Sequence, residues 1–286
     1  MKQFKTALLV LAILAIGITP VAAQNNVYAN NATFGKAYIY VMSPTFAISQ
    51  TIVNVNNSCT NGRGVVVVSG ILYYTCAATN VVFSYTLGTN TDNGPKFSVS
   101  GASALSTMAF DGANFWIGDY SGTNQAYLYT PTGTLLKTVH LVNCGGSCDG
   151  LEYFLQGGTT PRLISNRGDS VAPYDIYDTN GTLITAAFIT TTFSATGIAF
   201  DGTNFLVSEL NAGKIAKYNG GTGALISETA ITGAVAPNTP LVEDLSVDYA
   251  TTLPNTPAPS TLILMVVGLL AVLVTAGLLR RKTSQA

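Results

Sequence analysis

The heptapeptide Ala-Phe-Asp-Gly-Ala-Asn-Phe at residues 109–115 recurs almost unchanged as Ala-Phe-Asp-Gly-Thr-Asn-Phe at residues 199–205. The two copies start 90 residues apart. Each is followed by an alternating apolar run, a polar turn, a second run, a glycine-containing turn and a third run. Asp-Gly turns between short alternating runs are hairpin signals. The pair therefore predicts two copies of one antiparallel β-unit.

Weaker copies of the unit lie between and beside this pair, and the aligned starts are separated by 43, 43, 47 and 47 residues. Four strands in about 43–47 residues are typical of a β-propeller blade. We therefore predict an all-β propeller over residues 24–253, with blades that start at Gly64, Thr107, Gly150, Gly197 and Asp244.

The last copy is unfinished, and residues 25–53 look like the three strands that it lacks. We expect the strand at residues 245–249 to pair with these N-terminal strands. Sharing one blade between the chain ends closes the ring and removes an unpaired strand edge. This arrangement predicts five four-stranded blades. A six-bladed ring with a degenerate copy and a stacked sandwich are the alternatives.

The repeat resembles the blades of bacterial surface propellers related to the NHL, YVTN and lactonase-type families. The resemblance covers the general blade pattern across residues 25–250. It implies scaffolding or ligand binding more often than catalysis.

The N-terminus has the features of a secretory signal peptide over residues 1–23. Lys2 and Lys5 precede an apolar run at residues 7–18, Pro20 breaks the run, and Val-Ala-Ala follows at residues 21–23. A positive start, a short apolar run and small residues before the cleavage point define such peptides. An uncleaved N-terminal anchor is the alternative.

The C-terminus carries a second apolar segment. Residues 262–279 contain no charge, and 18 residues would form a helix of about 27 Å, close to the hydrocarbon thickness of a bilayer. Arg280, Arg281 and Lys282 follow at once. By the positive-inside rule, residues 280–286 form a cytoplasmic tail behind a transmembrane helix, and the domain ahead faces outward. Residues 254–261 form a proline-rich linker.

This tail resembles the PEP-CTERM sorting signal of exported bacterial proteins, in which a Pro-Glu-Pro motif precedes an apolar helix and a basic cluster. The motif corresponds to Pro257, Ala258, Pro259, Ser260 and Thr261, with Ala258 in place of the glutamate. The resemblance implies an exosortase-like processing protease as a partner and a setting in an exopolysaccharide matrix. A plain C-terminal membrane anchor is the alternative.

The composition excludes several functions. Charged residues make up only 9% of the chain and the net charge is −1. Nucleic-acid binding is not expected, because it needs clustered Lys and Arg. His140 is the only histidine, so no site can use two of them. No Gly-x-Ser-x-Gly motif accompanies it, which argues against a nucleophilic triad.

Four cysteines in an exported chain favour two disulfides. Cys144 and Cys148 can close a small loop. Cys59 precedes a blade and Cys76 ends that blade's second strand, so both fall on one face of a propeller. We therefore predict Cys59–Cys76 and Cys144–Cys148. A four-cysteine metal site and free buried thiols are the alternatives.

Candidate ligand residues gather on the face that carries the blade-entry loops and the loops after the second strands. Projection of the repeat places five residues there at equivalent positions: Asn30, Cys76, Asp119, Asn166 and Glu209. Asp149, Glu243 and Asp244 are expected on entry loops near the axis, and Glu152 on an innermost strand. The ligand-binding set predicted from this projection is Asp119, Asn166, Glu209, Asp149 and Asp244.

These features favour a non-catalytic component of the cell envelope or extracellular matrix, without a cofactor, that binds a polysaccharide or a surface protein. Two alternatives stay open. One is a lactonase-like hydrolase, in which Asp149, Glu152 or Asp244 would hold calcium, a cation that prefers oxygen ligands. The other is a protein-interaction platform without sugar binding.

Overall fold

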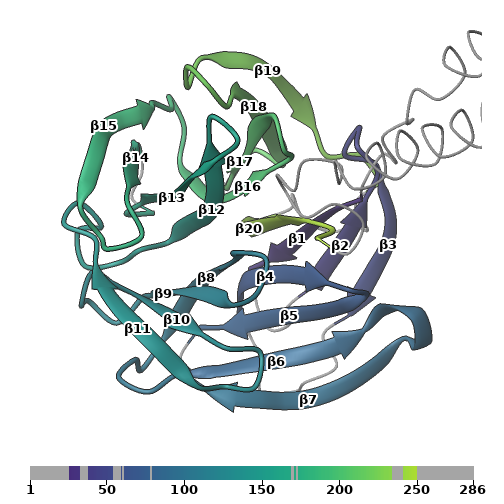
Figure 1. Ribbon diagram of the computed structural model, residues 1–286. Coiled ribbons are helices and arrows are strands. Elements are labelled where there is room, and N and C mark those ends of the chain that lie inside the picture. Colours follow the sequence, from purple (N-terminus) through teal and green to yellow (C-terminus); the bar gives the residue numbers. More distant parts are fainter. Residues whose placement is uncertain are drawn as a thin grey trace, which may run out of the picture.

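The computed structural model describes residues 26–32, 38–53, 59, 61–77, 79–168, 171, 173–233 and 241–249. These residues form five four-stranded antiparallel sheets arranged as a ring, which confirms the five-bladed propeller (Figure 1). The predicted signal peptide, linker, apolar segment and basic tail lie outside the described residues. Within the described ranges, no helix is long and apolar enough to cross a membrane.

Each blade runs from an innermost strand at the axis to an outer strand at the rim. Blade 1 consists of β20 (Val242–Val247), β1 (Val27–Asn31), β2 (Tyr38–Met42) and β3 (Ile48–Val53). Blade 2 consists of β4 (Gly62–Val68), β5 (Ile71–Cys76), β6 (Val81–Thr86) and β7 (Thr91–Ser98), with a 3₁₀ turn at Leu87–Thr89.

Blades 3, 4 and 5, like blade 2, each come from a single stretch of the chain. Blade 3 consists of β8 (Leu105–Phe110), β9 (Phe115–Asp119), β10 (Gln125–Tyr129) and β11 (Leu135–His140). Blade 4 consists of β12 (Gly150–Gln156), β13 (Thr160–Asn166), β14 (Tyr174–Tyr177) and β15 (Leu183–Ile189). Blade 5 consists of β16 (Ala195–Phe200), β17 (Asn204–Glu209), β18 (Lys214–Asn219) and β19 (Leu225–Ala230).

The ring closes as the sequence predicts. Strand β20 pairs antiparallel with β1, with Val247 opposite Val27 and Leu245 opposite Ala29. It also contacts β4 on one side and β16 on the other, so that the five innermost strands surround the axis (Figure 1). The C-terminal strand therefore completes the blade that the N-terminal strands begin.

The burial pattern explains why apolar residues alternate only in part of each repeat. All six residues of β8, β16 and β20 are buried, because these strands pack against neighbouring blades on both faces. The outer strand β19 is exposed at five of its six positions. Thr and Ser on such strands supply the polar surface that this chain, with few charges, needs.

The repeated heptapeptides form the same turn. Asp111 accepts hydrogen bonds at Oδ1 from the backbone N–H groups of Ala113 and Asn114. Asp201 does the same for Thr203 and Asn204. The glycine after each aspartate has a positive φ of 97° or 93°, which a side chain would disfavour.

We call the face at which the innermost strands begin the upper face, and the opposite one the lower face. The second strands end at the upper face. Val27 and Tyr249, near the two ends of the described ring, both lie at the lower face, because β1 starts there and β20 ends there. Tyr249 donates its backbone N–H to Val67 near the lower end of β4.

Both predicted disulfides are confirmed. Cys59 is bonded to Cys76, with Cα atoms 5.4 Å apart, and Cys144 to Cys148, with Cα atoms 4.8 Å apart. Both bonds fasten upper-face segments that lead into an innermost strand. Disulfides of this kind are typical of proteins in an oxidising environment.

Candidate functional site

Five equivalent residues surround the upper end of the axis. Each one directly precedes a predicted blade start, and together they are Arg63, Ser106, Asp149, Thr196 and Glu243. Ser106 and Thr196 bind the next blade, since their hydroxyls donate to the carbonyl oxygens of Cys148 and Val242. The other three carry charge and meet one another.

Arg63 is the centre of this charged group, which we call the axial cluster (Arg63, Asp149, Glu243 and Tyr120). Its Nη1 lies 2.9 Å from Glu243 Oε2 and 3.7 Å from Asp149 Oδ1. Its guanidinium carbon lies 4.5 Å from the centre of the Tyr120 ring. Blades 1, 2 and 4 and the loop after β9 of blade 3 are thus tied together at the axis.

One cation faces two buried carboxylates in the axial cluster. Burial raises the pKa of Asp149 to about 6 and that of Glu243 to about 7, while Arg63 partly opposes both shifts. Burial disfavours the charged form of a carboxyl group. Both carboxyl groups therefore keep their protons to a higher pH than ordinary carboxyl groups do, and their contacts with Arg63 join the blades.

Glu243 and Asp244 lie inside β20, and not on an entry loop as predicted. Asp244 is fully buried. Its Oδ2 accepts hydrogen bonds from the backbone N–H groups of Val65 (3.0 Å) and Met108 (3.1 Å). Burial raises its pKa well above the ordinary value. Asp244 therefore fastens blades 2 and 3 to the closing strand.

Glu152 lies on an innermost strand, as predicted, and is also buried. Tyr249 and the backbone N–H groups of Tyr153 and Phe200 are its hydrogen-bond donors. Burial raises its pKa to about 8.

The second strands end in two sets of residues, and not in the one set that the projection predicts. Cys76, Asp119 and Glu209 lie opposite the residue two positions before the predicted blade start, as does Asn31 in blade 1. In blade 4, Asn166 lies opposite Gly150 and accepts its N–H, as Thr75 does for Gly64 and Ser208 for Gly197. Asn166 therefore lies one residue before the position that is equivalent to Asp119.

The inner hairpin of blade 4 is longer than those of blades 2 and 5, since Gly150 and Asn166 are 16 residues apart but Gly64 and Thr75, like Gly197 and Ser208, are 11 apart. In blades 1, 2, 3 and 5 the ladder between the two inner strands contains one extra innermost-strand residue near the upper face, and in blade 4 the ladder begins below that point. By register, Arg167 and not Asn166 occupies the position of Asp119. Asn30, which pairs with Asp244, belongs to the Asn166 set.

Most of these upper-face side chains hold the ring. Asn30 donates to the carbonyl oxygen of Gly64 (2.9 Å), and Asn166 to that of Ala195 (2.8 Å). Both bonds connect a second strand to the next blade. Asp119 accepts from the backbone N–H of Ser121 (2.7 Å) and from the Thr123 hydroxyl, and so shapes its own loop. A ligand role for these residues stays a prediction.

Glu209 Oε1 is buried without a hydrogen-bond partner among the described residues, as Asn30 Oδ1 and Asp244 Oδ1 also are. Burial and the charge of Glu228 raise the pKa of Glu209.

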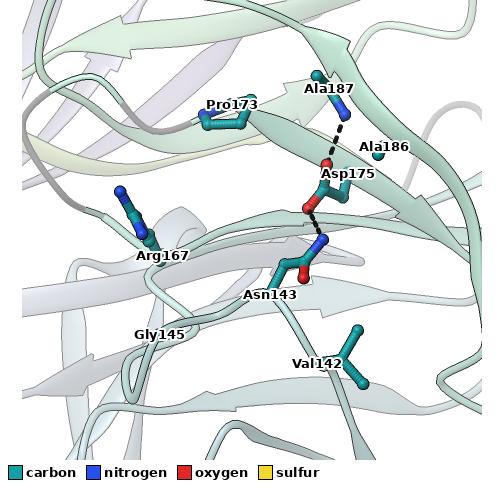
Figure 2. A pocket seen from close by; sticks show the side chains of 8 residues that line it. All are labelled: Val142, Asn143, Gly145, Arg167, Pro173, Asp175, Ala186 and Ala187. Carbon is teal, nitrogen blue, oxygen red and sulfur yellow. Dashed lines mark hydrogen bonds between the residues drawn. The ribbon is translucent and has the colours of Figure 1, made fainter.

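A cavity of about 490 Å³ opens beside blade 4, lined by Val142, Asn143, Gly145, Arg167, Pro173, Asp175, Ala186 and Ala187 (Figure 2). We call it the blade-4 pocket. Small-molecule sites have volumes of a few hundred to about 1,000 Å³. The disulfide loop 144–148 supplies one wall, and the start of β14 and the end of β15 supply another. These elements place the pocket at the upper face.

Asp175 forms the polar centre of the pocket. Its Oδ2 accepts a hydrogen bond from Asn143 Nδ2 (2.8 Å), and its Oδ1 accepts one from the backbone N–H of Ala187 (2.6 Å). Arg167 lies across the pocket from this column of residues (Figure 2). Its alkyl stem packs against Gly145, where a Cβ would come within 3.0 Å of Arg167 Cδ.

The predicted alternative of a calcium site depends on converging carboxylates. Asp149, Glu152 and Asp244 instead have separate partners, namely Arg63, Tyr249 and backbone N–H groups. Among the described residues, no three His, Cys, Asp or Glu side chains lie close enough to hold a metal ion.

Comparison with known proteins establishes the fold alone. No protein-family model matches the chain. A search of curated proteins gives no significant match either. A chain from the crystal structure of a nidogen/laminin complex is similar, with a TM-score of 0.50, 10% identity, and coverage of 78% of this chain and 97% of that one. Glutaminyl cyclase from Myxococcus xanthus is similar with a TM-score of 0.49 and 10% identity, and the match covers 62% of this chain and 76% of that one.

The sequence projection missed Arg63, Asn143, Arg167 and Asp175. Arg63 had a usable signal, because it precedes Gly64 as Asp149 precedes Gly150 and Glu243 precedes Asp244. The predicted repeat phase therefore already placed these three charges together. Asn143 and Asp175 had no such signal, since the pocket lies where blade 4 departs from the repeat.

Proposed function

We propose that this protein is an exported, surface-displayed propeller that binds extracellular polysaccharide without catalysis. The main support is the position of the chain ends. The two ends of the described ring lie at the lower face, whereas the blade-4 pocket and both disulfides lie at the upper face. A chain tethered by its ends therefore presents the upper face to its surroundings.

The predicted signals at the chain ends agree with this orientation. The signal peptide at residues 1–23 delivers the chain across a membrane, and residues 254–261 connect β20 to the predicted span at residues 262–279. Because β20 ends at the lower face, the chain leaves the described ring on the face opposite the pocket. The disulfides fit an oxidising compartment. An exosortase-like protease remains the proposed partner for the tail.

Non-catalytic binding is favoured by the way the acidic groups are used. The buried carboxylates of the axial cluster, Asp244 and Glu152 form bonds within the ring. The blade-4 pocket, in contrast, combines a carboxylate, a carboxamide and a guanidinium around an open volume. Such convergent polar groups in a cavity are typical of a ligand site.

Co-sedimentation with the polysaccharide of the protein's own host tests this proposal. The full-length protein, purified in detergent, should pellet with the isolated polymer and stay soluble without it. Failure to pellet, together with capture of a single host surface protein, would replace the polysaccharide by a protein ligand. Intact-mass analysis of the protein from its host tests the tail, since sorting predicts loss of residues after about Pro259 and a plain anchor predicts their retention.

A further inference from the structure

Blade 4 departs from the repeat at the pocket. In blades 3 and 5 the third and outer strands pair continuously to one bulge near the lower face. In blade 4 the pairing jumps from Tyr174 opposite Ile189 to Ile176 opposite Thr185. Asp175 therefore faces three residues of β15, namely 186–188. The ladder is interrupted here, and the pocket lies at the interruption.

The interruption is held open by an unusual arrangement. Register places Asp175 where blade 3 has Tyr127 and blade 5 has Ala216. Asp175 is only 4% exposed, and its Oδ1 replaces a ladder partner for the N–H of Ala187, whose φ is +50°. A left-handed alanine and a buried carboxylate each cost stability. Local departures with such costs concentrate at functional sites.

The lining restricts the chemistry of a ligand. One carboxylate (Asp175) and one guanidinium (Arg167) nearly balance in charge, so that the pocket suits neither a multiply charged anion nor a cation. No aromatic ring is among its lining residues, which argues against a flat apolar ligand. Small side chains between closely spaced donors and acceptors suit a compact molecule with many hydroxyl groups.

Asp175 can still accept a hydrogen bond from such a ligand. Its Oδ2 accepts bonds from Asn143 and from the Tyr177 hydroxyl (3.5 Å), whereas its Oδ1 accepts one bond, from the N–H of Ala187. A carboxylate oxygen has two lone pairs, so Oδ1 can accept one more bond from a hydroxyl donor. The Arg167 stem lies next to Gly145 of the disulfide loop, and its guanidinium lies across the pocket from Asp175 (Figure 2). A hydroxylated ring between the two walls would meet acceptors on one side and donors on the other.

We propose that the blade-4 pocket binds a neutral hexose unit of a polysaccharide chain, with Asp175 and Asn143 on one side of the sugar and Arg167 on the other. This inference rests on the proposed function and names the ligand chemistry at its site.

Isothermal titration of the full-length protein in detergent tests the inference with four probes: cellotetraose, maltotetraose, mannotetraose and tetragalacturonic acid. At least one neutral tetrasaccharide should bind at one site, and the charged one should bind more weakly. Asn143→Ala should weaken binding about tenfold, because it removes an amide from the wall. Ala186→Trp should abolish binding, because it fills the pocket from an exposed position on β15.

Thr138→Trp is the matched control, because Thr138 is an exposed residue on the outer strand of blade 3, opposite Tyr127, where the ladder is continuous. It should leave binding unchanged, and thermal melting should show that all variants fold. Binding that persists in Ala186→Trp, or that prefers tetragalacturonic acid, overturns the inference. No binding of any neutral probe also overturns it, and co-sedimentation with host polysaccharide would then show that the proposed function survives without this pocket.

Discussion

The hydroxyl of Tyr249 lies 2.9 Å from each carboxylate oxygen of Glu152, and both residues are buried at the centre of the ring. Tyr249 follows the closing strand, and Glu152 lies in blade 4. The bond therefore joins the last described residue of the chain to a blade on the other side of the axis.

Stability should fall as the pH rises, because Glu152 has a pKa of about 8 in the folded protein against 4.5 as its ordinary value. Between these pH values the folded state holds a proton that the unfolded state has lost, so this group lowers the unfolding free energy by about 1.4 kcal/mol per pH unit. Its contribution is complete below pH 4.5 and is lost on approach to pH 8. Asp149 and Glu243 act in the same direction.

Urea unfolding between pH 5 and pH 8, followed by the fluorescence of the single tryptophan, Trp116, measures this slope. Glu152→Gln should reduce the slope and raise stability at pH 8. Equal slopes in the two proteins would show that Glu152 does not carry the proton.

Removal of the cation from the axial cluster should be costly. Arg63→Met leaves Asp149 and Glu243 buried without an opposite charge, which destabilises a protein by about 3–5 kcal/mol. The loss should be greatest at pH 8 and smaller at pH 5, where both carboxyl groups gain protons. Urea unfolding at the two pH values tests the difference.

Lys214→Met is the control for this substitution. Lys214 pairs with Glu228 at 3.4 Å, but the two side chains are 43% and 34% exposed to solvent. Its loss should change stability by at most about 0.5 kcal/mol at either pH. Equal losses of stability in the two variants would show that the axial cluster contributes no more to stability than an exposed ion pair does.

The two disulfides should differ in their effects. Cys59 and Cys76 are 17 residues apart, and Cys144 and Cys148 are 4 apart. Loop-closure entropy predicts losses of about 3 and about 2 kcal/mol when each pair is replaced by alanine. Only the second replacement should also weaken sugar binding, since Asn143 directly precedes that loop and Gly145 lies in it. Titration and thermal melting of both double variants check this, and equal loss of affinity in both would contradict it.

Deletion of residues 242–249 should open the ring and leave the edge of β1 unpaired, because β20 covers that edge. Exposed strand edges promote association. Size-exclusion chromatography should therefore show oligomers or aggregates, whereas deletion of linker residues 254–261 should leave the elution unchanged. A monomeric variant without β20 would mean that closure is dispensable.

The sequence could predict those parts of the fold that repeat. The heptapeptides at residues 109–115 and 199–205 give the blade period, and the unfinished copy at Asp244 gives the closing strand. It could not predict Asn166 and Arg167 in their true positions, because Gly150 and Asn166 are 16 residues apart whereas Gly197 and Ser208 are 11 apart, so that counting from the blade start does not give the register. Asp175 could not be predicted as a site residue, because the equivalent position in blade 3 holds Tyr127 and the repeat gives no sign of a carboxylate there.

We proposed that the ring is displayed outside the cell. Labelling of intact host cells with a large amine-reactive reagent that cannot cross membranes tests it most directly, with the partly exposed Lys214 and Lys217 of blade 5 as targets. If the ring is outside the cell, both lysines should be labelled on intact cells to the same extent as after lysis. Labelling that occurs only after lysis would contradict it.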